Sequence, residues 1–221
     1  MNSISRLYLI TPLIEAPSQF SEILDAACSA GDIAAVMVRL AVADERTQIN
    51  RLKILAPIIQ RHDAAVMVAL EESDTSDIVT IAARGGADGI HVNYDQEEFR
   101  NLVDRLKGER SLGVGNLRSR DDAMFAGEMG ADYIMFGEPR PDGFTPPSEA
   151  ITERATWWAE IFETPCVVFA STDDSIEQMA MTGAEFIALP DSIWAKSKDD
   201  LSKAIKSACK TLEQVAASQA E

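Results

Sequence analysis

Polar side chains stand at the ends of several short apolar runs in this sequence, where they could bind a small molecule. Arg39 is the clearest case, because it directly follows the apolar run Val36–Val38. A charge at the end of a buried segment needs either a counter-charge or a ligand. Together these positions predict a polar ring of mixed charge. The candidate ligand-binding residues are Arg39, Asn93, Asn116, Arg118, Glu138, Arg140, Ser171, Thr172, Asp191 and Ser192.

A repeated phrase indicates which elements position these residues. It consists of a glycine, a small residue and an acid, followed by an apolar run. The copies start at Gly31, Gly86, Gly130 and Gly183, and the first of them is looser than the others. A glycine after a helix suits the left-handed conformation in which many helices end. The apolar runs are short and β-prone, as strands buried on both faces tend to be. Each copy therefore predicts a corner where a helix ends and a buried strand begins.

The intervals between the corners are each long enough for two β–α units of about 25–30 residues. Strands are expected at residues 6–11, 36–39, 65–70, 90–92, 111–115, 133–136, 165–170 and 186–189. Helices are expected at residues 17–30, 44–61, 74–84, 96–107, 119–129, 148–163, 173–182 and 197–217. This alternation predicts an α/β fold, a TIM (β/α)8 barrel formed as a single domain by residues 1–221. The alternative is an open doubly wound sheet, although the first strand lacks the Gly-rich turn typical of that fold. In a barrel, the polar ring would lie at the C-terminal mouth.

The charge balance argues against two classes of partner. The chain has 20 Lys and Arg residues against 36 Asp and Glu residues, a net charge of −16 at pH 7. Such a surface repels nucleic acid and anionic lipid. No apolar stretch approaches the ~18 residues of a membrane span, and no secretion signal is seen. The three cysteines are widely spaced, which predicts a cytoplasmic protein without a disulfide framework. The charge and the short apolar stretches predict that it binds neither nucleic acid nor membrane.

The predicted strands and corners resemble the thiamine-phosphate synthase and TenI family of barrels. The segments that carry the resemblance are Leu7–Thr11 (LYLIT), Ala87–Val92 (ADGIHV), Gly130–Gly137 (GADYIMFG), Gly183–Ala188 (GAEFIA) and Ser192–Trp194 (SIW). The resemblance implies an enzyme that joins a pyrimidine carbocation, formed as diphosphate leaves, to a thiazole phosphate with the help of Mg²⁺. It also implies a homo-oligomer.

The resemblance suggests a metal site made of two carboxylates. Glu71 and Asp95 follow neighbouring predicted strands and lie near the family's metal-binding positions. Mg²⁺ accepts one or two carboxylates together with water and substrate phosphate. Mg²⁺ is therefore a possible cofactor, with Glu71 and Asp95 as its candidate ligands.

The loops depart from the family pattern. Of the family's Gln-x-Arg-x-Lys motif, Arg39 alone is kept. The glycines that would seat a phosphate are replaced by Ala170–Thr172, followed by Asp173 and Asp174, and the serine after the last strand is replaced by Asp191. Carboxylates at these positions would compete for the N–H donors and repel a phosphate.

The sequence leaves more than one functional hypothesis. The favoured one is a divergent family barrel that has lost or changed its chemistry and binds a small molecule at its mouth. The alternative is an active thiamine-phosphate synthase, in which Arg39 holds diphosphate and Arg140 replaces a missing lysine. A third is another barrel enzyme such as an isomerase or aldolase, although no lysine ends a strand to form a Schiff base. His62 and His91 are interpreted as structural residues.

Overall fold

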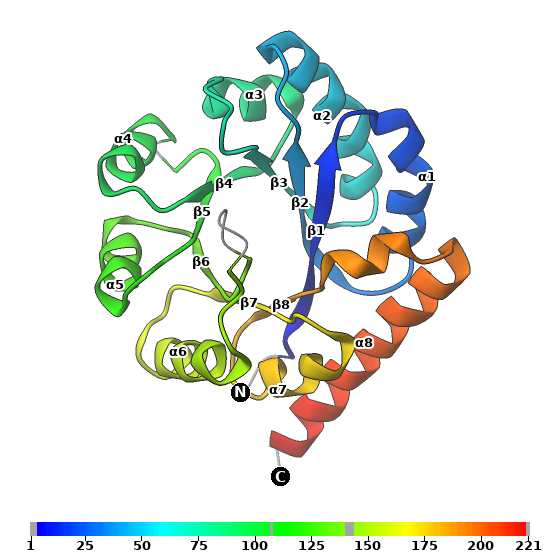
Figure 1. Ribbon diagram of the computed structural model, residues 1–221, viewed down its shortest axis with the longest axis vertical. Helices are drawn as coiled ribbons and strands as arrows, with labels where there is room; N and C mark the ends of the chain where they lie inside the picture. Colours follow the sequence, from blue (N-terminus) through cyan, green and yellow to red (C-terminus); the bar gives the residue numbers. More distant parts are fainter. Residues whose placement is uncertain (1–3, 107, 140–143, 220–221) are drawn as a thin grey trace.

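Eight parallel strands form a closed barrel in the computed structural model, which describes residues 4–106, 108–139 and 144–219. Each strand pairs with the next along the chain, and β1 also pairs with β8 to close the ring (Figure 1). The predicted (β/α)8 barrel is confirmed, and the open-sheet alternative is wrong. The strands are β1 (Arg6–Ile14), β2 (Ile33–Leu40), β3 (Ala65–Leu70), β4 (Gly89–Asn93), β5 (Ser111–Gly115), β6 (Tyr133–Phe136), β7 (Cys166–Phe169) and β8 (Phe186–Ala188).

The helices surround this barrel, as Figure 1 shows. The α-helices are α1 (Pro17–Cys28), α2 (Glu45–Gln60), α3 (Ile78–Gly85), α4 (Gln96–Leu106), α5 (Arg120–Met129), α6 (Ser148–Ile161), α7 (Ile176–Ala180) and α8 (Lys198–Gln219). Two 3-10 helices, η1 (Asp173–Ser175) and η2 (Asp191–Ala195), precede α7 and α8. The predicted helix at residues 173–182 is therefore divided. The predicted helix at residues 74–84 begins later, because the Asp77 side chain caps it by accepting from the N–H of Val79.

The first strand is longer than predicted. Thr11 and Pro12 lie within β1, and the pairing with β2 shifts between Ile10 and Leu13, so that Leu13 pairs with Arg39. Proline has no N–H to give to a strand ladder, which favours such an irregularity. The hydroxyl of Thr11 instead accepts a hydrogen bond from the backbone N–H of Arg39 at 3.0 Å. The longer β1 and β2 thus carry Arg39 to the mouth of the barrel.

The repeated phrase has a structural cause beyond its glycine. Gly86, Gly130 and Gly183 adopt the expected positive φ, but Gly31 does not. A Cβ on Gly31 would lie 2.5 Å from Sγ of Cys209, so this glycine instead permits α8 to pack closely. The acids of the three closer copies each accept a hydrogen bond from the first or second N–H of a neighbouring strand. These bonds run from Val66 to Asp88 (2.8 Å), from Leu112 to Asp132 (2.7 Å) and from Cys166 to Glu185 (2.9 Å).

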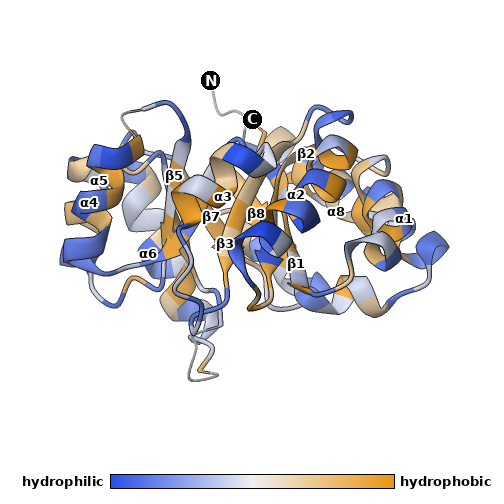
Figure 2. Ribbon diagram, turned by 90° about the horizontal axis from the view of Figure 1, so that it is seen from above, coloured by the Kyte–Doolittle hydropathy of each residue, from blue (hydrophilic) through white to orange (hydrophobic). Residues whose placement is uncertain are grey.

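Apolar side chains fill the space between the strands and the helices as well as the inside of the barrel. Figure 2 shows hydrophobic strands at the centre and hydrophilic outer faces on the helices. The barrel is therefore a packed core, and a ligand must bind at one of its ends. Buried residues inside the barrel include Tyr8, Ile10, Met37, Met67, Tyr133, Met135 and Phe169. Among the described residues, no helix is both long enough and apolar enough to cross a membrane.

Candidate functional site

Two ion pairs lie at the mouth of the barrel. The first joins Arg39, near the end of β2, to Asp191, the first residue of η2, with 3.5 Å between Nη1 and Oδ2. Their side chains are 37% and 56% exposed. Partial burial raises the pKa of the Asp191 carboxyl above its usual range, although the charge of Arg39 acts in the opposite direction. Arg39 therefore has the counter-charge that its position predicts. This counter-charge is Asp191, one of the acids found where the family resemblance implies a phosphate-binding site.

The second ion pair involves a residue that sequence reasoning missed. Lys196 follows η2, and its Nζ lies 3.5 Å from Oδ2 of Asp173, the first residue of η1. The segment before Lys196 is held against β1, because Nε1 of Trp194 donates to the carbonyl of Ile10 at 2.6 Å. The only signal in the sequence was the position of Lys196 shortly after the matching Ser192–Trp194 segment. The two pairs show that cations remain at the mouth and that acids neutralise both.

Three predicted residues lie beside these ion pairs. Ser171 and Thr172 follow β7, and Ser192 lies within η2; all three are exposed. The backbone of Thr172 is fixed by Ser175, whose hydroxyl accepts from the Thr172 N–H and donates to its carbonyl. These hydroxyls are thus accessible to a ligand at the β7–β8 side of the mouth.

Two other predicted ligand-binding residues, Asn93 and Arg118, do not lie at the β7–β8 side of the mouth. Asn93, at the end of β4, and Arg118, after β5, are exposed. The carbonyl of Arg118 accepts a hydrogen bond from Arg154 of α6 at 2.7 Å, so the loop after β5 is attached to α6. Arg140 lies outside the described residues.

Glu138 and Asn116 form a separate polar group at the β5–β6 side of the mouth. Asn116 follows β5 with a φ of 55°, and its backbone N–H donates to Oε1 of Glu138. The Glu138 carboxylate lies over Gly115, where a Cβ would come within 3.0 Å of both this carboxylate and Nε2 of His91. Oδ1 of Asn116 is shielded from solvent and has no hydrogen-bond partner among the described residues.

A cavity of about 180 Å³ adjoins this group. It lies between the ends of β5 and β6 and the start of α6, and sequence reasoning did not predict it. Its polar residues include Asn116, Glu138 and Arg154, whereas the rest of its wall is largely apolar. The apolar wall includes Leu117, Phe136, Phe144, Pro147 and Ile151.

The two predicted metal ligands each accept hydrogen bonds from backbone N–H groups. Oε2 of Glu71 accepts from the backbone N–H of Val42 at 3.2 Å. Oδ1 of Asp95 accepts from the N–H groups of Glu97 and Glu98, at the start of α4. Both carboxylates are therefore engaged by backbone donors, and the described residues contain no group of three His, Cys, Asp or Glu side chains suited to a metal ion. The binding of Mg²⁺ by Glu71 and Asp95 stays a prediction.

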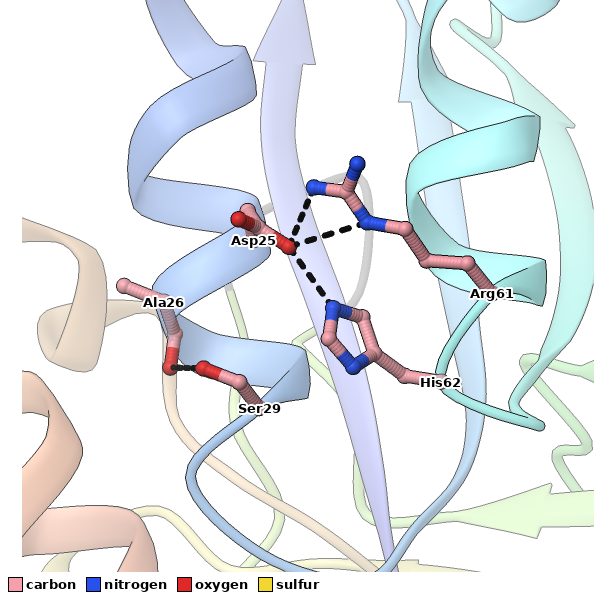
Figure 3. Close-up of polar contacts among 5 residues, drawn as sticks. All are labelled: Asp25, Ala26, Ser29, Arg61 and His62. Atoms are coloured by element: carbon pink, nitrogen blue, oxygen red, sulfur yellow. Dashed lines mark hydrogen bonds and ion pairs between the residues drawn. The ribbon is translucent and has the colours of Figure 1, made fainter.

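The two histidines occupy very different surroundings. His62 contacts Asp25 through Nε2 at 2.7 Å, beside Arg61, where α1 and α2 end at the N-terminal face (Figure 3). The nearby Ser29 hydroxyl donates to the carbonyl of Ala26, so these residues do not form a serine–histidine–aspartate triad. His91 is buried inside the barrel, and its Nδ1 lies 2.9 Å from the Tyr133 hydroxyl.

Comparisons with known proteins agree with the resemblance seen in the sequence. A family model described as thiamine monophosphate synthase matches residues 7–193. A thiamine-phosphate synthase of Rhodospirillum centenum is 36% identical over 191 residues, which cover 86% of this chain and 89% of that protein. A thiamine-phosphate synthase of Erythrobacter litoralis is 31% identical over 201 residues, with the same coverage. The solved thiamine phosphate pyrophosphorylase from Pyrococcus furiosus has a TM-score of 0.75 at 23% identity, covering 95% of this chain and 96% of that chain.

Proposed function

Because this chain belongs to the thiamine monophosphate synthase family, we propose that it is a transferase of thiamine biosynthesis. In this reaction, hydroxymethylpyrimidine diphosphate loses diphosphate, which leaves with the bonding electron pair. The pyrimidine carbocation is then captured by thiazole phosphate. The observation that carries the proposal is the 36% identity to a thiamine-phosphate synthase across 86% of the chain. The comparisons therefore favour the active enzyme over the hypothesis of lost chemistry.

Arg39 and Lys196 are the groups that we propose for the leaving diphosphate. Both are cations at the mouth, and their present partners, Asp191 and Asp173, lie 3.5 Å away and are more than half exposed. Exposed ion pairs of this kind contribute at most about 1 kcal/mol. A diphosphate with several charges can displace such partners. The acids of the mouth then act as counter-ions that an anionic substrate replaces.

A second candidate is a family barrel that binds a different, less anionic small molecule. It is favoured by the same ion pairs, because Asp191 and Asp173 neutralise the cations that a diphosphate would need. Mutual repulsion between these acids and a diphosphate would weaken its binding. The two candidates differ in whether the protein turns over the thiamine precursors.

The setting of the reaction follows from the same considerations. We propose that the protein works in the cytoplasm as a homo-oligomer, on small-molecule substrates, and that it binds neither nucleic acid nor membrane. The net charge of −16 supports the last part of this proposal, since it disfavours polyanionic partners. Size-exclusion chromatography with light scattering tests the oligomer, and a monomer mass would contradict it.

The test is the formation of thiamine phosphate from the two precursors, followed by mass spectrometry with Mg²⁺ or with EDTA. We expect the wild-type rate to exceed the buffer rate and to fall by roughly 100-fold in Arg39→Gln, because a charge that stabilises the leaving group is lost. Arg84→Gln is the matched control, since Arg84 is an exposed arginine of α3 that pairs with Glu45. A wild-type rate equal to that of buffer would contradict the proposal and favour the second candidate.

A further inference from the structure

The cavity beside β6 has room for one ring. Its volume is about 180 Å³, and a cavity of roughly 150 Å³ is known to hold a benzene molecule. Leu117, Phe136 and Ile151 supply apolar walls. This space is separate from the Arg39–Asp191 pair, which belongs to β2 and η2. The cavity is therefore suited to the ring of a ligand, whereas the cations at the other side are suited to its charged group.

The carboxylate of Glu138 lies at the boundary between this cavity and the inside of the barrel. Glu138 contributes to the cavity wall, and its Oε1 accepts the N–H of Asn116. Its position depends on Gly115, because a Cβ there would come closer than 3.0 Å to the carboxylate. The carboxylate is thus directed inward over β5. An acceptor in this position selects ligands that donate hydrogen bonds.

Beneath Glu138, a buried chain of hydrogen bonds reaches through the barrel. The hydroxyls of Tyr8 and Tyr133 lie 2.7 Å apart, and the Tyr133 hydroxyl lies 2.9 Å from Nδ1 of His91. Nε2 of His91 faces the same space above Gly115 as the Glu138 carboxylate. The chain therefore links the interior of the barrel to the polar end of the cavity.

The direction of this chain fixes the tautomer of His91. Among the described residues, the Tyr8 hydroxyl has no hydrogen-bond partner other than Tyr133, and its surroundings inside the barrel are largely apolar. Every hydroxyl proton is satisfied if Tyr8 donates to Tyr133 and Tyr133 donates to Nδ1 of His91. Burial lowers the pKa of His91 to about 4, so the ring is neutral at pH 7. The ring proton must then lie on Nε2, which borders the same space above Gly115 as the Glu138 carboxylate.

We propose that the cavity binds the ring end of the ligand, and that Glu138 accepts hydrogen bonds from an amidine or amino group on that ring while His91 positions the Glu138 carboxylate. Carboxylates bind planar N–H donors with two parallel hydrogen bonds, and charge strengthens such pairs. The acidic surface also favours a cationic group. The guanidinium of Arg154, which also lines the cavity, donates to the carbonyls of Leu117 and Arg118. The inference rests on the proposed function in placing the ligand at the mouth.

Binding of two probes of nearly the same shape tests the role of Glu138. Benzamidine carries an amidinium group, whereas benzamide is neutral. By calorimetry, we expect the wild-type protein to bind benzamidine at least roughly 10-fold more tightly than benzamide, a difference of about 1.4 kcal/mol. Glu138→Gln should abolish this preference, whereas Glu149→Gln, which removes an exposed charge from the first turn of α6, should keep it. Equal binding of the probes by the wild type, or loss of the preference in both variants, would overturn the proposal. The assay needs no second substrate, so its outcome is separate from that of the transfer reaction.

The role of His91 can be tested by finding which of its ring nitrogens carries the proton. The chain has two histidines, so ¹⁵N NMR can assign both, with the partly exposed His62 as internal reference. We expect the proton of His91 on Nε2 at pH 7 in the wild type and a mixture of tautomers in Tyr133→Phe. Benzamidine binding should weaken roughly 3-fold in Tyr133→Phe and be unchanged in the matched variant Tyr94→Phe. A proton on Nδ1 in the wild type, or unchanged binding in Tyr133→Phe, would overturn the positioning role.

Discussion

Replacement of Asp191 by asparagine should strengthen the binding of inorganic pyrophosphate. The carboxylate lies 3.5 Å from the guanidinium of Arg39, which corresponds to about 1.2 kcal/mol of attraction in bulk water and about 4.7 kcal/mol at an effective dielectric constant of 20. The two side chains are 37% and 56% exposed, so screening by solvent keeps the effect near the lower figure. An increase in affinity of roughly 5- to 10-fold follows, since 1.4 kcal/mol corresponds to a factor of ten.

Isothermal titration calorimetry with inorganic pyrophosphate at low salt measures this change. Asp104→Asn, which removes an exposed charge from α4, is the matched control and should leave the affinity unchanged. Because burial raises the pKa of Asp191, its carboxylate becomes neutral at a higher pH than that of an ordinary aspartate. The advantage of Asp191→Asn over the wild type should therefore shrink as the pH is lowered, beginning at a higher pH than for an ordinary aspartate. Equal affinity in Asp191→Asn and the wild type at pH 7 would refute the idea that Asp191 competes for Arg39.

Three further predictions concern the second ion pair and the barrel interior. Lys196→Met should weaken pyrophosphate binding roughly 3- to 10-fold, whereas Asp173→Asn should strengthen it. Calorimetry can measure both affinities, and a change in the same direction in both variants would contradict the role of the ion pair. Gly113→Ala should lower the free energy of unfolding by about 3 kcal/mol, because the added Cβ would lie 2.0 Å from the ring of Tyr133. Urea unfolding measures this change, and an unchanged unfolding midpoint would contradict the prediction. Burial lowers the pKa of His91 from 6.5 to about 4, so the unfolded chain binds a proton that the folded protein excludes. Stability is thus fully present above pH 6.5 and should fall by up to about 3 kcal/mol toward pH 4; urea unfolding of His91→Gln should lack this part of the slope.

The fold was largely predictable because local signals repeat along the chain. Gly86, Gly130 and Gly183 end helices in the expected left-handed conformation. The acid after each of these glycines also has a regular role, since it binds the N–H of an adjacent strand. Gly31 begins a looser copy of the same phrase, yet it is needed for close packing against Cys209 in α8, which lies far away in the sequence. Such long-range packing is not readable from a local pattern.

The candidate site was predictable only in part. The position of Arg39 at a strand end correctly indicated a need for a counter-charge, but the identity of that partner depends on the closure of the barrel by η2. Lys196 could not be assigned, because its contact with Asp173 joins η1 to the residue after η2, and the sequence does not specify how these two segments lie relative to each other. The inward direction of Glu138 depends on the missing side chain of Gly115 in a neighbouring strand. In each case the decisive information lies in pairs of residues from different β–α units.

A crystal structure of the protein with inorganic pyrophosphate tests the central claim about the mouth most directly. The account predicts a pyrophosphate ion bound between Arg39 and Lys196, with the carboxylates of Asp191 and Asp173 turned away from these cations. Pyrophosphate bound elsewhere, with both ion pairs intact at 3.5 Å, would contradict it.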